Sequence, residues 1–153
     1  MDKKYIGLLG AMIGLVRAAE KNGKTEDTDR VLLEGLRTIR HGGEAEPLLS
    51  RVREEKAKAA PNCAHCAMPC GSTADADMEA LEAADARCAV IRYRILSELL
   101  RAADRLLPAV KAGIDDPEAM YLLHKGLFYV GEDADEMTLR AVHEEVLALR
   151  ASS

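Results

Sequence analysis

Residues 78–107 read MEALEAADARCAVIRYRILSELLRAADRLL and carry the longest regular pattern in this chain of 153 residues. Apolar side chains recur at steps of three and four, the spacing that places them on one face of an α-helix. The apolar positions are Met78, Leu81, Ala84, Cys88, Ile91, Ile95, Leu99, Ala102 and Leu106. The pattern predicts one long helix that begins near Thr73 and is bent or ended by Pro108.

Three more helices are predicted before this stretch, over about residues 3–21, 28–39 and 45–59. The first two are followed by Asn22-Gly23 and by His41-Gly42-Gly43, and glycine commonly follows the last residue of a helix. Two further helices are predicted after the long one. The earlier begins at Asp116-Pro117, and the later is capped by Asp133, with Glu136 three residues on, and runs to about Ala151.

The first helix contains the apolar run from Tyr5 to Val16, which follows a charged start as in a signal peptide. Its apolar side chains share one helical face and no clean cleavage pattern follows, so we interpret it as a core helix. The run is also too short to span a bilayer. Gly7, Gly10 and Gly14 weaken an isolated helix, so they predict that another backbone approaches closely there.

The composition agrees with a helical, globular protein. Hydrophobic residues make up 48% of the chain, charged residues 31% and aromatic residues only 3%, and the abundant Ala, Leu, Glu and Arg favour helices. Short connections between helices favour antiparallel neighbours. The sequence therefore predicts an all-α, single helical domain over residues 1–153. Its architecture would be an antiparallel helical bundle of about six helices, with a cysteine-rich loop, residues 60–73, between helices three and four.

The charge pattern argues against nucleic acid as a partner. The net charge is −5, and phosphate contacts require clustered Lys and Arg. Arg87, Arg92 and Arg94 are close together, but acidic residues precede them on the same predicted helix, so we interpret this cluster as a solvated face. No membrane segment is predicted, and a cytoplasmic location follows, where thiols stay reduced.

The cysteine-rich loop reads NCAHCAMPCG over residues 62–71, a C-x2-C-x3-C run. Two cysteine thiolates separated by two residues can bind the same metal ion, and a third cysteine can provide a third sulfur ligand. Cys70 also precedes a predicted helix start, whose partial positive charge favours the thiolate. Cys63, Cys66 and Cys70 are therefore predicted to bind a metal.

The fourth ligand is left open by the sequence. Cys88 is a candidate, although its apolar neighbours mark a core-facing position, where free cysteine often packs as a small hydrophobe. His65 lies inside the loop, and His124 lies on an apolar helix face, where a satisfied core histidine is the simpler interpretation. The candidates are therefore Cys88, His65, His124 or no protein ligand.

The identity of the metal is also open. Structural zinc sites usually contain two C-x2-C pairs or one pair with two histidines, whereas clustered cysteines with one distant ligand suit iron–sulfur clusters. We predict an iron–sulfur cluster, with zinc as the alternative. A zinc site would only staple the loop to a helical interaction module. In a third hypothesis, Cys63 and Cys66 exchange thiol and disulfide, with His65 stabilising a thiolate.

Two segments of the first helices, YIGLLGAMIGLV over residues 5–16 and DRVLLEGL over residues 29–36, are followed near the C-terminus by LHKGLFY over residues 123–129. The first third of the chain resembles the helical bundle domain of hybrid-cluster proteins and carbon monoxide dehydrogenases. In that family, however, the cubane cysteines precede the first helix, and later α/β domains hold the catalytic cluster. The resemblance implies iron–sulfur over zinc, and it implies neither hydroxylamine reduction nor carbon monoxide oxidation.

These observations predict a helical metal-binding protein with an electron-transfer, sensing or accessory role. They identify no catalytic constellation, so enzymatic activity is left undecided. The partner is an unidentified redox protein or other protein, and an exposed helix face would also allow a homo-oligomer.

Overall fold

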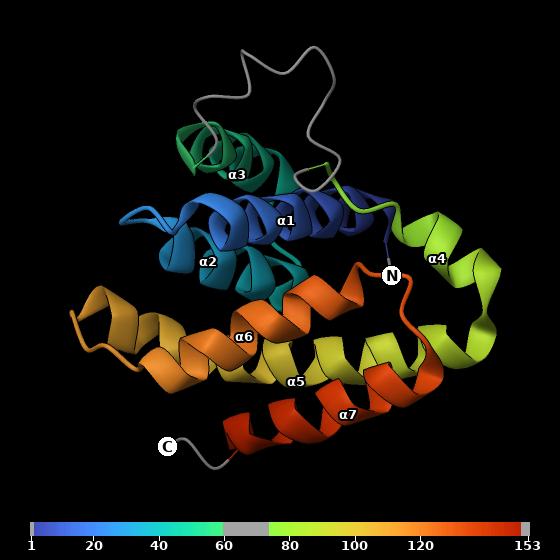
Figure 1. Ribbon diagram of the computed structural model, residues 1–153. Coiled ribbons are helices and arrows are strands. Elements are labelled where there is room, and N and C mark those ends of the chain that lie inside the picture. The colour runs from blue at the N-terminus through green and yellow to red at the C-terminus, as the bar shows by residue number, and fades with distance from the viewer. Residues whose placement is uncertain (1, 60–73, 151–153) are drawn as a thin grey trace. The chain divides into compact units, whose positions relative to one another are not determined.

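The computed structural model describes residues 2–59 and 74–150 (Figure 1). These two ranges contain seven α-helices, one 3-10 helix and no strand. The all-helical class that the composition predicts is therefore confirmed for the described part of the chain. Contacts divide the chain into two compact units, Met1–Ala76 and Asp77–Ser153.

The first unit consists of three helices: α1 spans Lys3–Asn22, α2 spans Thr28–His41 and α3 spans Ala45–Ala59. Each of the three packs against the other two. Glycines follow α1 and α2 as predicted, and Gly42 adopts the left-handed conformation while its N–H bonds to the Thr38 carbonyl. The bounds of all three helices agree with the sequence-based prediction to within two residues.

Helix α1 lies at the centre of the first unit. The sequence predicts that one face of this helix is buried. Every residue from Leu8 to Val16 is buried, so over this stretch the helix is covered on all sides. The reason is that glycine and alanine occupy the positions between the large apolar residues, and they can be covered without burying a polar side chain. The interpretation of residues 5–16 as a core helix is confirmed.

The second unit is arranged around a long helix. Helix α4 spans Met78–Ala84, α5 spans Ala86–Lys111, α6 spans Pro117–Val130, α7 spans Glu136–Val146 and the 3-10 helix η3 spans Leu147–Arg150. Helix α5 packs against all four of the others. Figure 1 shows α6 running back along α5, and α7 running in the opposite direction to α6.

The predicted single helix across residues 78–107 is wrong, because Asp85 divides it into α4 and α5. The backbone of Asp85 is extended, with φ −156° and ψ 110°, and its Oδ1 accepts a hydrogen bond from the Arg87 N–H at 2.9 Å. The first backbone N–H groups of a new helix have no acceptor within the helix. The Asp85 carboxylate accepts from one of them, so dividing the helix at this residue costs little free energy. Asp77 caps α4 in the same way, by accepting from the Ala80 N–H at 3.1 Å, and α4 therefore begins at Met78 and not near Thr73.

Pro108 lies inside α5 and does not end it, since the helix continues to Lys111. Proline removes one backbone hydrogen bond. Only one more turn follows it here, and the long apolar face of α5 stabilises the helix through packing. Gly113, with φ 78°, follows the helix end.

Asp135, and not Asp133, caps α7. Its Oδ1 accepts from the Thr138 N–H at 2.7 Å, because Asp135 immediately precedes the first helical residue and Asp133 lies two residues too early. The α-helix also ends at Val146, and the chain continues to Arg150 as η3. The division at Asp85 raises the number of α-helices in the described residues from the predicted six to seven.

Candidate functional site

The predicted metal ligands fall in two different parts of the chain. Cys63, Cys66, Cys70 and His65 belong to residues 60–73, which lie outside the described residues. Cys88 lies in α5 and His124 in α6. Within residues 2–59 and 74–150, no group of three or more His, Cys, Asp or Glu side chains is arranged to hold a metal ion. The metal site on the cysteine-rich loop stays a prediction.

The chain on both sides of residues 60–73 is fixed to the first unit. Before them, Ala59 ends α3 and is buried. After them, the Ala76 N–H donates to the Gly10 carbonyl at 3.1 Å, and Arg17 donates from Nη1 to the Ala74 carbonyl at 2.9 Å. Lys56 of α3 also lies 3.5 Å from the Asp75 carboxylate. The described residues that flank the cysteines are therefore held on α1 and α3.

Gly10 provides the space for this attachment. A Cβ atom added there would lie only 2.5 Å from the Ala76 carbonyl oxygen, so a larger residue would push the backbone away. The prediction that a glycine of α1 allows a close backbone approach is confirmed at Gly10. At Gly7 the described residues give no such approach, since none of their atoms would lie within 4 Å of an added Cβ.

Replacing Gly10 by alanine is expected to lower the free energy of unfolding by about 1 kcal/mol. Overpacking costs roughly 1–3 kcal/mol, and the better helix propensity of alanine returns about 1 kcal/mol. The matched control is Gly7→Ala in the same helix, which we expect to stabilise by roughly 0.5–1 kcal/mol. Urea unfolding of both variants measures the difference, and equal effects of the two would show that the Ala76 backbone does not restrict α1.

Cys88 is buried near the start of α5, with 4% of its surface exposed. Its Sγ donates to Asp85 Oδ2 at 3.5 Å and to the Ala134 carbonyl at 3.9 Å. Burial raises the pKa of the Cys88 thiol, and the Asp85 carboxylate raises it further. The protonated thiol is thus favoured at neutral pH, which makes Cys88 a poor nucleophile. Its assignment as a metal ligand stays a prediction.

Arg92, one turn after Cys88, is buried as well, with 3% of its surface exposed. Its Nε and Nη2 donate to the Glu132 carbonyl at 3.2 and 3.1 Å. Cys88 and Arg92 together hold the connection between α6 and α7 against α5. The interpretation of Arg92 as part of a solvated face is wrong, whereas Arg87 and Arg94 are exposed as expected. The burial of Arg92 could have been predicted from its spacing. It follows the core-facing Cys88 by four residues, and residues four apart lie on the same face of a helix.

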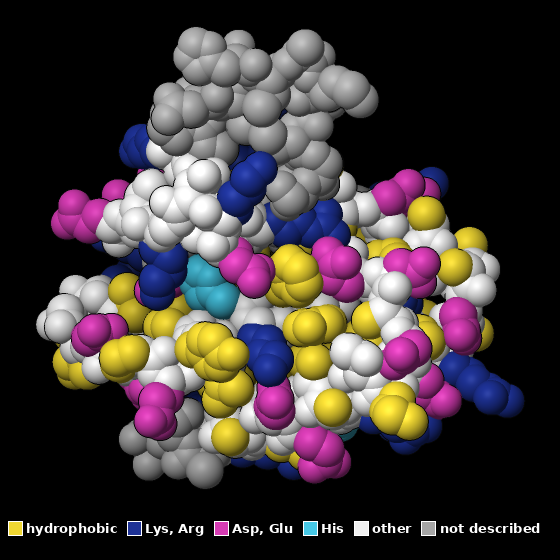
Figure 2. Space-filling model, in the orientation of Figure 1, with side chains coloured by type: hydrophobic (Ala, Val, Ile, Leu, Met, Phe, Trp, Pro, Cys, Tyr) yellow, Lys and Arg dark blue, Asp and Glu magenta, His cyan; other side chains and the backbone are white. Residues whose placement is uncertain are grey.

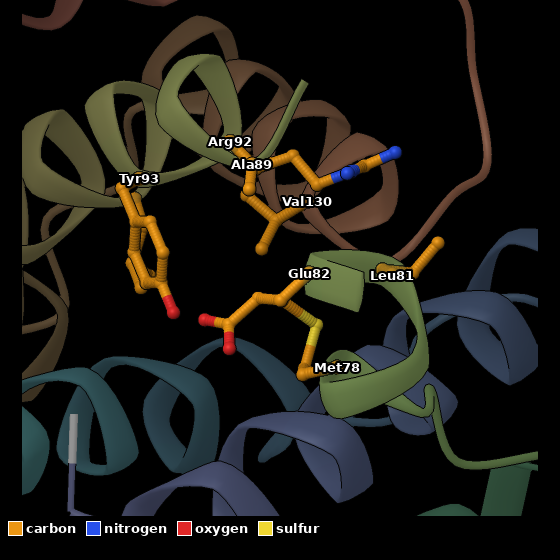
Figure 3. Close-up of a pocket in the computed structure, with 8 residues that line it drawn as sticks. Met78, Leu81, Glu82, Ala89, Arg92, Tyr93 and Val130 are labelled. Carbon is orange, nitrogen blue, oxygen red and sulfur yellow. The ribbon is translucent and has the colours of Figure 1, made fainter. Parts of the chain in front are cut away.

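A pocket lies beside Arg92 in the second unit. It is a shallow depression: the space of about 230 Å³ between its side chains includes open solvent, and the enclosed part has room for about one water molecule. Helix α4 contributes Met78, Leu81 and Glu82, α5 contributes Ala89, Arg92, Tyr93 and Leu96, and α6 contributes Val130. Figure 3 shows the Tyr93 hydroxyl and the Glu82 carboxylate pointing toward each other, with the Arg92 guanidinium on the side of Leu81. Most of the lining is apolar.

The described surface carries mixed charge. On the face drawn in Figure 2, basic and acidic side chains alternate over the described residues and form no continuous basic stripe. In the same described ranges, no helix is long and apolar enough to cross a membrane. His124 is partly buried in α6, and His143 is partly buried in α7.

Comparison of the chain with protein-family models, with curated proteins and with solved structures finds no match, so the resemblance to the hybrid-cluster and carbon monoxide dehydrogenase family stays a prediction.

Proposed function

We propose that this chain is a helical metal-binding protein that carries an iron–sulfur cluster on Cys63, Cys66 and Cys70. The observation that carries the proposal is the C-x2-C-x3-C run, NCAHCAMPCG over residues 62–71. Three thiols within eight residues are well suited to one cluster, because thiolates are its usual ligands. The cluster would serve electron transfer, sensing or a partner enzyme.

The attachment of the flanking residues supports this proposal. Ala59 is buried at the end of α3, and Ala74 and Ala76 are bonded to α1, so both ends of the cysteine-rich loop belong to one compact unit. A metal bound between such fixed ends adds its binding free energy to the folding of that unit. We therefore expect removal of the metal to lower the stability of the first unit.

The fourth ligand is a separate question. Cys88 is a buried thiol that already donates to Asp85 and Ala134, so a metal at this sulfur would displace a proton whose pKa is raised. His65 and His124 are the alternatives. The iron content of the Cys88→Ala variant tests whether Cys88 is the fourth ligand. A loss of iron as large as in Cys70→Ser would identify Cys88 as a ligand, and an iron content equal to that of the wild type would exclude it.

The decisive experiment is an anaerobic purification followed by metal and sulfide analysis and a visible spectrum. We expect iron, acid-labile sulfide and a broad visible absorbance in the wild type. All three should be lost in Cys70→Ser, because a serine hydroxyl is a poor replacement for a thiolate. Stoichiometric zinc without colour would replace the cluster by a structural zinc site, and a folded protein without metal would leave only thiol chemistry for Cys63 and Cys66.

A further inference from the structure

The break between α4 and α5 interrupts a sequence that favours one helix on both sides of it. The apolar stripe continues through the break, since Leu81, Ala84, Cys88 and Ile91 follow one another at steps of three and four. Residues 78–107 contain no glycine or proline, and most of them are Ala, Leu, Glu or Arg, which favour helices. Neither the composition nor the periodicity of this segment therefore explains the break.

The Asp85 carboxylate explains the bend through its own hydrogen bonds. Oδ1 accepts from the Arg87 N–H at 2.9 Å, and Oδ2 accepts from the Cys88 thiol at 3.5 Å. These hydrogen bonds lower the pKa of Asp85, so the ionised carboxylate holds the bend at neutral pH. Residues 83–87 are all exposed, so packing of the side chains at the break does not fix the angle between α4 and α5.

A continuous helix would satisfy the same backbone donors. Helical hydrogen bonds run from an N–H to the carbonyl four residues earlier, so the Arg87 N–H would bond to Ala83 and the Cys88 N–H to Ala84. The last four carbonyls of a helix have no partner within it. In a continuous helix those at the end of α4 would gain partners from α5. Backbone hydrogen bonding thus does not favour the bent form.

The side chain of Met78 favours the bent form. Met78 is the one buried residue of α4, with 5% of its surface exposed. It lies in the shallow depression with Ala89 and Leu96 of α5 and Val130 of α6. Straightening the helix would carry Met78 away from these side chains. One buried methionine and one cap therefore oppose a small number of additional helical hydrogen bonds, and contributions this few leave the two forms close in free energy.

We propose that Asp85 is a hinge at which α4 and α5 interconvert between the bent form described here and one continuous helix over residues 78–111. The bent form predominates because it buries Met78, and the straight form is a minor state in exchange with it. The release of the Asp85 cap is the step that divides the two forms. Reorientation of a whole helix of this kind belongs to the microsecond-to-millisecond range.

NMR of the full-length Asp85→Ala variant tests the hinge, because the change removes the cap and introduces the strongest helix former. We expect Cα shifts typical of a helix at residues 84–86 and an unbroken series of sequential amide contacts over residues 78–111. The matched control is Asp77→Ala, which removes the cap that accepts from the Ala80 N–H but lies outside the break. The control and the wild type should both show an interruption at residue 85. An interruption that persists in Asp85→Ala would overturn the proposal.

Two further measurements keep the test independent of how well Asp85→Ala folds. Asp85→Asn retains a side chain that caps helices about as well as aspartate, so it should stay bent, and a straight helix in this variant would contradict the role of the cap. In the wild type, relaxation dispersion should show exchange at the amides of residues 84–87. Flat dispersion profiles at these amides would also overturn the proposal, since the straight form would then not be populated.

Discussion

Replacing Leu99 by alanine is expected to lower the free energy of unfolding by about 2–5 kcal/mol, the range for large-to-small changes in a packed core. Leu99 lies in α5 with none of its surface exposed. An added Cβ at Gly126 of α6 would lie 2.8 Å from Leu99 Cδ2 and 3.2 Å from Val146 Cγ1, so three helices meet around this side chain. Because their backbones are already close, little collapse can fill the space that alanine leaves.

The matched control is Ile114→Ala, at a residue of the same unit with 61% of its surface exposed. We expect this change to stay within about 0.5 kcal/mol of the wild type. Urea unfolding monitored by circular dichroism provides both values. A loss at Leu99 no larger than that at Ile114 would contradict the packing of α5, α6 and α7 around it.

Replacing Arg150 by methionine is expected to lower the free energy of unfolding at neutral pH, because the change removes the ion-pair partner of a buried carboxylate. Arg150 donates from Nε to Glu98 Oε2 at 2.9 Å and from Nη2 to Glu98 Oε1. Glu98 is buried in α5, so the variant leaves a carboxylate in the core with Arg101, at 3.8 Å, as its remaining ion-pair partner among the described residues.

The effect should depend on pH in a defined direction. Hydrogen bonds from Arg150 lower the pKa of Glu98 below its unfolded value of 4.5, although burial opposes them. The ionised pair therefore stabilises the protein above that value, and the contribution is lost as the pH falls through the lowered pKa. The difference between wild type and variant should be full at pH 7 and should shrink below about pH 4.

Urea unfolding of wild type, Arg150→Met, Glu98→Gln and the double variant at several pH values measures this coupling. We expect the loss caused by Arg150→Met to be smaller in the Glu98→Gln background, because no buried charge is then left unpaired. An equally large loss in both backgrounds, unchanged by pH, would show that Arg150 stabilises η3 by packing and not through its charge.

Much of the helix order could be predicted because the helix ends carry explicit residues. Gly23 and Gly42 adopt positive φ angles that favour glycine, and Asp116 caps α6 by accepting from the Ala119 N–H at 3.1 Å. Asp85 was missed because the apolar steps of three and four continue through it, from Leu81 and Ala84 to Cys88. Periodicity reports which face is apolar, and it does not report where one backbone helix stops and another begins.

The candidate site was predictable to a smaller extent. Spacing alone predicts Cys63, Cys66 and Cys70 as ligands, since C-x2-C-x3-C is a local pattern, and this prediction falls outside the described residues. The burial of Arg92 was missed because charge dominates the interpretation of an arginine, whereas the turn that accepts its hydrogen bonds lies 40 residues away in sequence. The pocket could not be predicted, because its walls come from three helices whose contacts depend on the fold.

The shortness of α4 has a consequence for the local stability of the second unit. This helix has seven residues, and of these only Met78 is buried. A helix this short is marginal without tertiary contacts, and segments with few buried apolar side chains open locally at a lower free energy than the rest of a protein. Since α4 provides Met78, Leu81 and Glu82 beside Arg92, local unfolding of this one helix would expose that side of α5 to solvent while α5 and α6 stay folded.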